Sequence, residues 1–175
     1  MAAREAAGRE ASPSAGVIDS QSVKTTQSGG IRGFDAAKLV KGRKRHIITD
    51  TGGLPVGAMV HATDIQDRDG APTLLASIRS AFPRLRHVFA DGGYAGAKPT
   101  EALNELGTWT LEIVKRSDAA KGFVLLPRRW VVECTFAELG RNRRLAKEFE
   151  ATIESAEAWL LIARIQLLSR RIARA

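Results

Sequence analysis

The order of the predicted elements indicates an α/β domain, built as a mixed sheet with helices packed on it. Three β-rich runs come first, then a helix, a strand, a second helix and another strand, and two long helices close the 175-residue chain. Partly alternating runs rich in Val and Ile identify the strands, and apolar residues three and four apart identify the helices. A chain of this length can bury one substantial core.

The first third of the chain contains a leader, a strand, a loop and a hairpin. Residues 1–15 are rich in Ala, Gly, Ser and charge, and we expect them to be a disordered leader before a single domain over 16–175. Residues 17–24 predict a strand, and the polar, Gly-rich stretch 25–39 predicts a loop. Residues 42–62 predict a hairpin, because two β-rich runs flank the turn sequence Gly-Gly-Leu-Pro.

The middle of the chain alternates helix and strand. Helices are predicted over 69–82 and 98–107, where apolar spacing and Pro or Gly punctuation agree. Between and after them, 85–90 and 109–116 predict strands. These elements extend the sheet and cover one of its faces.

Two helices are predicted at the end of the chain, over 129–149 and 153–173. In the second, apolar residues step by four, three and four along one face, which we expect to pack on the sheet rather than in a dimer. The residues of this stripe are Leu161, Ile165, Leu168 and Ile172.

Composition points to a phosphate-rich partner. The chain carries 27 Lys and Arg against 19 Asp and Glu, a formal net charge of +8, which attracts nucleic acid or anionic membranes. No apolar run approaches the roughly 20 residues that span a bilayer, so we expect no membrane partner. A single cysteine, Cys134, excludes an internal disulfide and a Cys-based zinc site and fits a cytoplasmic protein.

Three acidic residues stand in settings that suggest chemistry. Asp19 and Asp91 each follow a short apolar run, and Glu133 lies on a predicted helix whose next turns are rich in arginine. Carboxylates near buried strands are costly unless a cation meets them. Two strand ends and a crossing helix can bring the three together, and two or three carboxylates suffice for a pair of Mg²⁺ or Mn²⁺ ions that act on a phosphodiester.

Each of these acids also has an ordinary structural explanation. Asp91 precedes Gly-Gly and could be a turn residue, Asp19 could cap a turn, and Glu133 could form a helical ion pair. Asp64, Asp67 and Asp69 form a competing cluster, which is better explained as negative charge at a helix N-terminus. The three histidines, His46, His61 and His87, show no ligand spacing and are expected to be structural.

Two basic clusters are candidates for DNA contact. Helical spacing puts Arg141 and Arg144 on the face of Glu133, with Arg143 and Lys147 beside them, and guanidinium groups suit phosphate oxygens. The alternative is a solvated basic helix. The second cluster lies at the start of the hairpin and could equally be a solvated strand edge; its members are Lys41, Arg43 and Lys44.

At these residues the chain resembles the DDE transposases of bacterial insertion sequences, of the insertion-sequence-five type. The segments that carry the resemblance include VIDSQSVKT, KGRKRHIITDTGGL, DIQDRDGA, FADGGYAG and RNRRLAKEFE. They occur in the expected order and cover the chain from Ser12 onward. The resemblance implies an RNase H-like fold and a divalent-metal catalytic triad that falls on Asp19, Asp91 and Glu133. It also implies that Arg129, four residues before the glutamate, belongs to the same motif.

The resemblance further implies cleavage of double-stranded DNA at an element's terminal inverted repeats and joining of the ends to target DNA, by a protein that forms multimers on DNA in the nucleoid. The chain departs from the family pattern at Cys134, where Arg is usual, and at Glu138, where Trp is usual and where a negative charge would lie near the site. It also lacks the family's N-terminal helical domain, which suggests the second reading frame of a two-frame element that works with an upstream-frame DNA-binding domain.

Two other functions remain open at this point. A non-catalytic DNA-binding modulator, or a decayed transposase fragment, would bind DNA without cutting it. A general nuclease would cut DNA without end specificity and never join strands.

Overall fold

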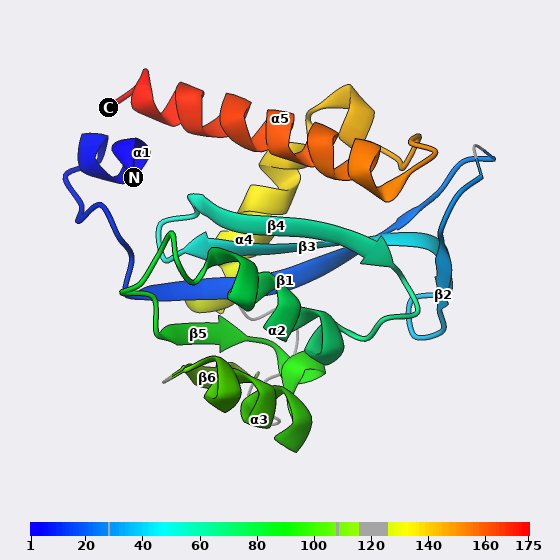
Figure 1. The fold of residues 1–175 in the computed structure, drawn as a ribbon. Coiled ribbons are helices and arrows are strands. Elements are labelled where there is room, and N and C mark those ends of the chain that lie inside the picture. Colours follow the sequence, from blue (N-terminus) through cyan, green and yellow to red (C-terminus); the bar gives the residue numbers. More distant parts are fainter. Residues whose placement is uncertain (28, 108, 116–125) are drawn as a thin grey trace.

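The computed structural model describes residues 1–27, 29–107, 109–115 and 126–175, and its strands form one mixed sheet (Figure 1). In these parts of the chain the strands are β1 (Ala15–Lys24), β2 (Gly33–Asp35), β3 (Val40–Asp50), β4 (Pro55–Ala62), β5 (His87–Ala90) and β6 (Thr110–Ile113).

The sheet is antiparallel on one side of β1 and parallel on the other. β1 pairs antiparallel with β3, which in turn pairs antiparallel with β2 and β4. On its other side β1 pairs parallel with β5, and β5 pairs parallel with β6. The predicted hairpin is confirmed: β3 and β4 are joined by a turn in which Gly53 has a positive φ of 82° and its N–H donates to the carbonyl of Asp50.

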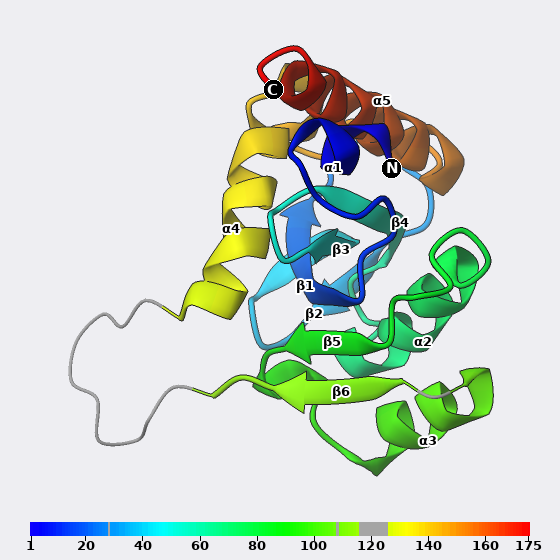
Figure 2. The same ribbon diagram turned by 90° about the vertical axis from the view of Figure 1, so that its left-hand side faces the viewer.

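Helices cover both faces of this sheet, as Figure 2 shows from the side. α2 and α3 lie on one face, while α4 and α5 lie on the other, with α1 beside α5. Within the described residues no helix is long and apolar enough to cross a bilayer. The helices, with two short 3₁₀ turns, are α1 (Ala2–Ala6), α2 (Asp67–Ile78), η1 (Gly92–Tyr94), α3 (Ala97–Leu106), α4 (Pro127–Gly140), η2 (Arg143–Leu145) and α5 (Ile153–Ile172).

Adjacent residues of the central strands feed two separate cores. Ile18 packs with residues of α2 and α3, whereas its neighbour Val17 packs with Val132 and Phe136 of α4. Side chains of a strand point alternately to the two faces, so each face of the sheet receives its own apolar layer. The result is an α/β fold of RNase H-like type, in agreement with the sequence.

The amino-terminal residues 1–15, expected to be disordered, hold a short helix that packs on the domain. Arg4 of α1 is buried and ion-pairs with Asp50, a fully buried carboxylate that Arg9 also contacts at 3.2 Å. Composition did not reveal this, because the stabilising partner Asp50 is the last residue of β3, far along the chain.

Two predicted boundaries differ in the structure. The expected loop 25–39 contains β2, which adds a short edge strand to β3. The helix expected over 129–149 ends at Gly140 and is followed by η2, so the basic residues after it are not on α4. The predicted strand 109–116 is observed as β6, and residue 116 lies outside the described residues.

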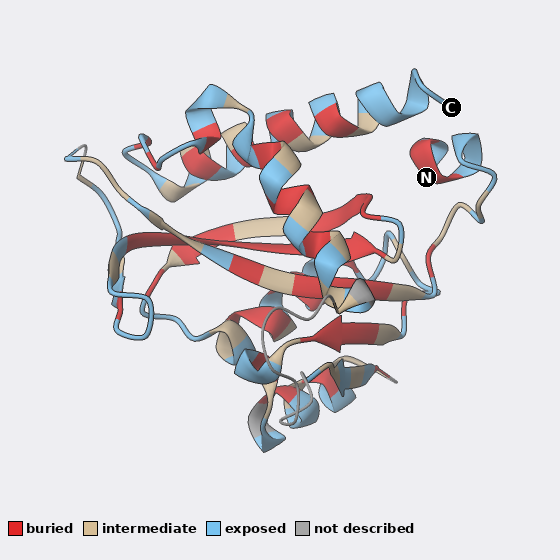
Figure 3. Ribbon diagram, turned by 180° about the vertical axis from the view of Figure 1, so that it is seen from behind, coloured by how far each residue is buried: buried red, intermediate tan, exposed pale blue. Residues whose placement is uncertain are grey.

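The apolar stripe predicted for the last helix does not pack on the sheet. The face of α5 that packs there holds Ala156, Leu160, Ala163 and Leu167. Leu161, Ile165 and Ile172 are about half exposed, on the outer side that Figure 3 shows in pale blue. The stripe was assigned to the wrong phase of the helix because two small alanines, Ala156 and Ala163, alternate with the leucines on the face that packs on the sheet.

Part of the basic cluster at the start of the hairpin is buried, which corrects the expectation that Arg43 and Lys44 contact DNA. Arg43 is fully buried and donates to the carbonyls of Ile31, Glu150, Ala151 and Thr152 at 2.8–3.0 Å. Lys44 donates to the carbonyl of Ile65 at 2.7 Å and pairs with Asp67 at the same distance. Both side chains therefore hold the fold together from inside.

We expect Arg43→Gln to lower the free energy of unfolding by about 3–5 kcal/mol, because it leaves several buried carbonyls and Glu148 without their cation. Lys41→Gln, an exposed position two residues earlier on the same strand, should change it by less than about 0.5 kcal/mol. Urea unfolding of the two variants and wild type measures the difference, and an equal effect at both positions would contradict the structural role of Arg43.

Candidate active site

Strand register sets the first two acids side by side. Ala15, Gly16 and Val17 of β1 pair with His87, Val88 and Phe89 of β5. Asp91 directly follows β5 in an extended conformation, so continuing the register by two residues brings it level with Asp19. Neighbouring strands lie about 4.8 Å apart, which makes the two carboxylates close neighbours at this level of the sheet.

Asp19 is the more deeply placed of the two. Its side chain lies on the α4 face of β1, two residues beyond Val17, and its Oδ1 accepts a 2.7 Å hydrogen bond from the N–H of Ser20. Burial, together with the nearby charge of Asp91, raises the pKa of Asp19 to about 6 despite the opposing effect of the Ser20 hydrogen bond. The fold thus keeps a carboxyl group in a place that disfavours its charge.

Arg129 joins the second and third acids. Glu133 lies one turn after Arg129 on α4, and the Nη2 atom of Arg129 is 3.7 Å from Glu133 Oε1 and 3.6 Å from Asp91 Oδ2. The Asp91 side chain is oriented from below by the N–H of Gly93, which donates to Oδ1 at 2.8 Å. Two of the three acids therefore contact one guanidinium group, whose charge also lowers the pKa of the third, Asp19, without contacting it.

The donor chemistry of these residues fits a hard divalent cation, because all three offer carboxylate oxygens. In the described parts of the chain, however, no three acidic, His or Cys side chains lie close enough together to hold a metal ion. The Glu133 side chain is 46% exposed and can change rotamer without unpacking the helix. The position between Asp91 and Glu133 is taken by the positive charge of Arg129.

A fourth carboxylate, Asp67, supports the site from the opposite face of β1. Its Oδ1 accepts from Ser20 Oγ and from Lys44 Nζ, each at 2.7 Å. Burial alone would raise the pKa of Asp67, but these two hydrogen bonds more than offset burial and leave its pKa lowered. Asp67 is thus an ionised anchor for the residue next to Asp19, a role that its place at the start of α2 did not reveal.

Sequence reasoning also missed a buried hydrogen-bond chain beside the acids. Tyr94, three residues after Asp91, meets His46 Nε2 at 2.6 Å, and His46 Nδ1 meets His61 Nε2 at 3.3 Å. Burial lowers the pKa of His46 to about 3, with the charge of a protonated His61 adding to the effect, so His46 is neutral at pH 7. The sequence did offer a signal, because all three are polar residues close to apolar runs. Tyr94 follows Asp91 by three residues, and His46 and His61 lie in the two strands of the predicted hairpin.

The predicted basic residues fall into separate places. Arg129 belongs to the acid cluster, whereas Arg141 and Arg143 are exposed beyond the end of α4. Arg144 ion-pairs with Glu150 and lies over the ring of Trp159, with its Cζ 5.0 Å from the ring centroid. The helical face expected to hold Glu133 together with Arg141 and Arg144 does not exist, because α4 ends before both arginines.

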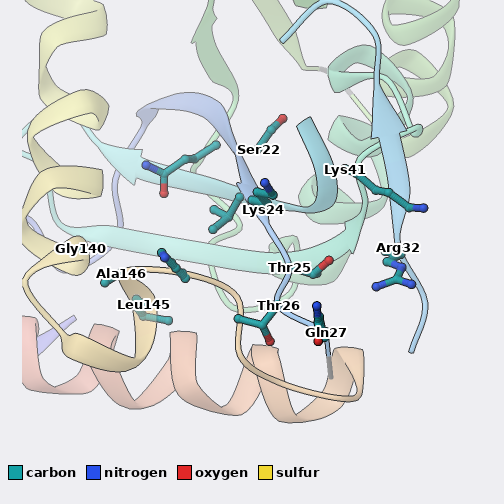
Figure 4. Close-up of a pocket in the computed structure, with 13 residues that line it drawn as sticks. Ser22, Lys24, Thr25, Thr26, Gln27, Arg32, Lys41, Gly140, Leu145 and Ala146 are labelled. Atoms are coloured by element: carbon teal, nitrogen blue, oxygen red, sulfur yellow. The ribbon is translucent and has the colours of Figure 1, made fainter. Parts of the chain in front are cut away.

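Lys41 and Lys147 come together in a groove at the far end of β1 (Figure 4). The groove has a volume of about 900 Å³, and none of the three acids lines it. Lys24 and Arg32, which sequence reasoning did not select, complete its set of cations. We call it the cationic groove. Its lining residues are 21–27, 32, 41, 140 and 145–147.

The two departures from the family pattern lie away from the acids' oxygens. Glu138 was expected to add negative charge near the site, but both of its oxygens accept from Arg171 Nη2 of α5, at 3.0 and 3.1 Å. Its charge is therefore used to join two helices. Cys134 is half-buried beside Glu133.

Comparison with known proteins agrees with this geometry. Residues 10–168 match the family model described as "Transposase DDE domain". The chain is also 32% identical over 126 residues to a protein from Burkholderia cepacia named "Putative transposase for insertion sequence element IS402". That match covers 68% of this chain and 59% of the relative, so the chain spans a little over half the length of the relative. Since the family model covers most of the chain, the protein belongs to the transposase DDE domain family.

Proposed function

We propose that this domain carries out metal-dependent cleavage of double-stranded DNA and strand transfer at the terminal inverted repeats of an insertion sequence. One observation carries the proposal: Asp91 directly follows β5, where the register continued from β1 brings it level with Asp19, and Arg129 lies within 4 Å of both Asp91 and Glu133. The strand order matters here, because β1 and β5 are neighbours in the sheet and so bring the two aspartates near each other.

Asp19, Asp91 and Glu133 would hold two Mg²⁺ or Mn²⁺ ions. The raised pKa of Asp19 supports this assignment, because it means that the protein supplies too little positive charge to this buried carboxyl. Bound divalent ions would supply the Lewis acidity that phosphoryl transfer needs.

The surrounding residues prepare the site. The N–H of Gly93 fixes the Asp91 carboxylate, and the pair of Ser20 and Asp67 fixes the strand beside Asp19. Arg129 balances the charges of Asp91 and Glu133, and its guanidinium would also suit a phosphate oxygen of the DNA. Arg141, Arg143 and Lys147 would contact the DNA backbone farther out.

The wider setting follows from the same proposal. Residues 16–175 would be the catalytic unit of a cytoplasmic, nucleoid-associated protein that forms homo-oligomers on element ends and target DNA. An upstream-frame N-terminal domain would supply recognition of those ends.

A second candidate is a non-catalytic DNA-binding modulator or a decayed transposase fragment. It is favoured by the present arrangement of the acids in the described part of the chain, where Arg129 occupies the space between two of them and no three are within reach of one ion. It predicts salt-sensitive DNA binding without cleavage.

Cleavage of supercoiled plasmid separates the two candidates. With Mg²⁺ or Mn²⁺ we expect nicking by wild type and a loss of roughly a hundredfold or more in Glu133→Gln, because a metal ligand contributes several kcal/mol to the transition state. Glu138→Gln is the matched control on the same helix, and its nicking rate should stay close to that of wild type because Glu138 faces Arg171. Binding without cutting in all three proteins would favour the modulator.

Thermal unfolding tests the buried charge of Asp19. A folded-state pKa of about 6 against 3.8 for an ordinary Asp means that the fold binds the extra proton between these values and loses stability as pH rises through them. We therefore expect Asp19→Asn to be more stable than wild type by roughly 2–3 kcal/mol at pH 7.5, and equally stable below about pH 4.

The same measurement with Mg²⁺ tests its role as a ligand. Millimolar Mg²⁺ should raise the melting temperature of wild type and leave Asp19→Asn unchanged. Asp64→Asn, which removes an exposed carboxyl, should respond to Mg²⁺ as wild type does. In the pH series without Mg²⁺, a stability difference between Asp19→Asn and wild type that does not change with pH would show that Asp19 is ionised at no unusual cost.

A further inference from the structure

The cationic groove presents four positive side chains and no carboxylate: Lys24, Arg32, Lys41 and Lys147 line it, and no Asp or Glu does. We propose that this groove binds the sugar-phosphate backbone of duplex DNA that extends from the cleavage position along β1. The inference rests on the proposed function for the location of the cut, but DNA binding in the groove can be measured without any cleavage.

The charges of the groove are available to a ligand. All four cations are exposed, and in the described ranges none forms an ion pair with a carboxylate. They differ in this from three cations that follow Lys41 on β3. Arg43, Lys44 and Arg45 are buried, and each is paired with an acid. Unpaired cations that line one concave surface create a positive potential there, and this potential attracts an anionic ligand.

The remaining lining suits phosphate rather than a lipid surface. Glutamine and hydroxyl side chains line the groove beside the cations, and Figure 4 labels Thr25, Thr26 and Gln27 on the segment that follows Lys24. These side-chain types make most protein contacts to phosphate and sugar oxygens. Val23 and Leu145 are the larger apolar members, and they are half-buried and buried, so the groove offers no apolar side chain for insertion into a bilayer.

Both walls of the groove lead back to the acids. Lys24 follows Asp19 by five residues on β1, so at ~3.3 Å per residue the two are about 16 Å apart. On the other wall α4 runs from Glu133 to Gly140, which lines the groove. Duplex DNA advances ~3.4 Å of helix axis per phosphate on one strand, so the groove lies about five phosphates from a cut at the acids.

A buried arginine, Arg45, fixes the wall of the groove that residues 145–147 form. Arg45 Nη1 donates to the carbonyl of Leu145 at 2.6 Å, and its Nη2 donates to the carbonyl of Lys147 at 3.2 Å. The N–H of Thr26 donates to the carbonyl of Glu148 at 2.9 Å, which ties this wall to the chain beyond β1. The groove is therefore preorganised, and a ligand need not order it.

The test is the salt dependence of DNA binding in EDTA, measured by the fluorescence anisotropy of a labelled duplex of about 30 base pairs and mixed sequence. Each lost phosphate contact should lower the slope of log K against log salt by about 0.9, so we expect a loss of about 1.8 for Lys24→Gln combined with Lys41→Gln. The matched control is Arg79→Gln with Arg86→Gln, which removes two exposed charges near the opposite end of β5 from Asp91.

We expect the control pair to change the slope by less than half as much as the groove pair. Equal slopes for the groove pair and wild type would overturn the proposal, and so would equal losses in the groove and control pairs, since net charge alone would then explain them. The four substituted side chains are exposed, so thermal unfolding should confirm that every variant folds as wild type does.

A second probe locates the groove relative to the cut. One uncharged methylphosphonate about five phosphates from the cleavage position should weaken binding by wild type and leave the groove pair unaffected. If wild type binds through the groove but never cleaves, the proposed function fails and the groove assignment stands. If wild type cleaves while the groove pair binds and cleaves as wild type does, only the groove assignment fails.

Discussion

The buried guanidinium groups of Arg43 and Arg45 connect parts of the chain that are a hundred residues apart. Both contact Glu148, and both donate through their terminal nitrogens to backbone carbonyls between Leu145 and Thr152. Arg43 Nε donates to the carbonyl of Ile31, whereas Arg45 Nε has no partner among the described residues. Burying two such charges is costly unless each donor is satisfied, and the pKa of Arg45 is lowered mainly by that burial. The carbonyls and Glu148 offset the cost, and in doing so they fix the start of α5 and the wall of the cationic groove.

The acids depend on a different constraint, the register between β1 and β5. A parallel pair has no tight turn to set its register, so the alternating apolar side chains of β1 must do so: Val17 faces the α4 core and Ile18 the α2 core. A slip of one residue would turn Asp19 toward α2 and Ser20 toward α4. The two apolar layers that fix the register of β1 therefore also fix the face of the sheet on which Asp19 lies.

Sequence reasoning could find the α/β fold class, because the order of its elements depends on local patterns. A short apolar run followed by Asp and Gly-Gly indicates the end of a strand, and the Gly-Gly-Leu-Pro turn indicates a hairpin. It could not separate Lys41 from Arg43 within one basic cluster, because their burial depends on the chain between 145 and 152. For the same reason it missed the end of α4 and the sheet-facing side of α5, where tertiary packing selects small alanines.

The net positive charge of the chain is divided between three tasks. Buried cations such as Arg43 hold the fold, and exposed cations such as Lys24 remain for a ligand. In the described part of the chain, Arg129 is the cation that forms ion pairs with the candidate acids. Arg129 can contact Asp91 and Glu133 together, but it reaches Asp19 only through space, and the pKa of Asp19 stays raised by burial. The unbalanced negative charge is thus concentrated on the deepest acid, which lies level with Asp91. A divalent ion held by Asp19 and Asp91 would therefore offset the cost of burying the Asp19 carboxylate, a cost that Arg129 leaves in place because it contacts Asp91 and Glu133.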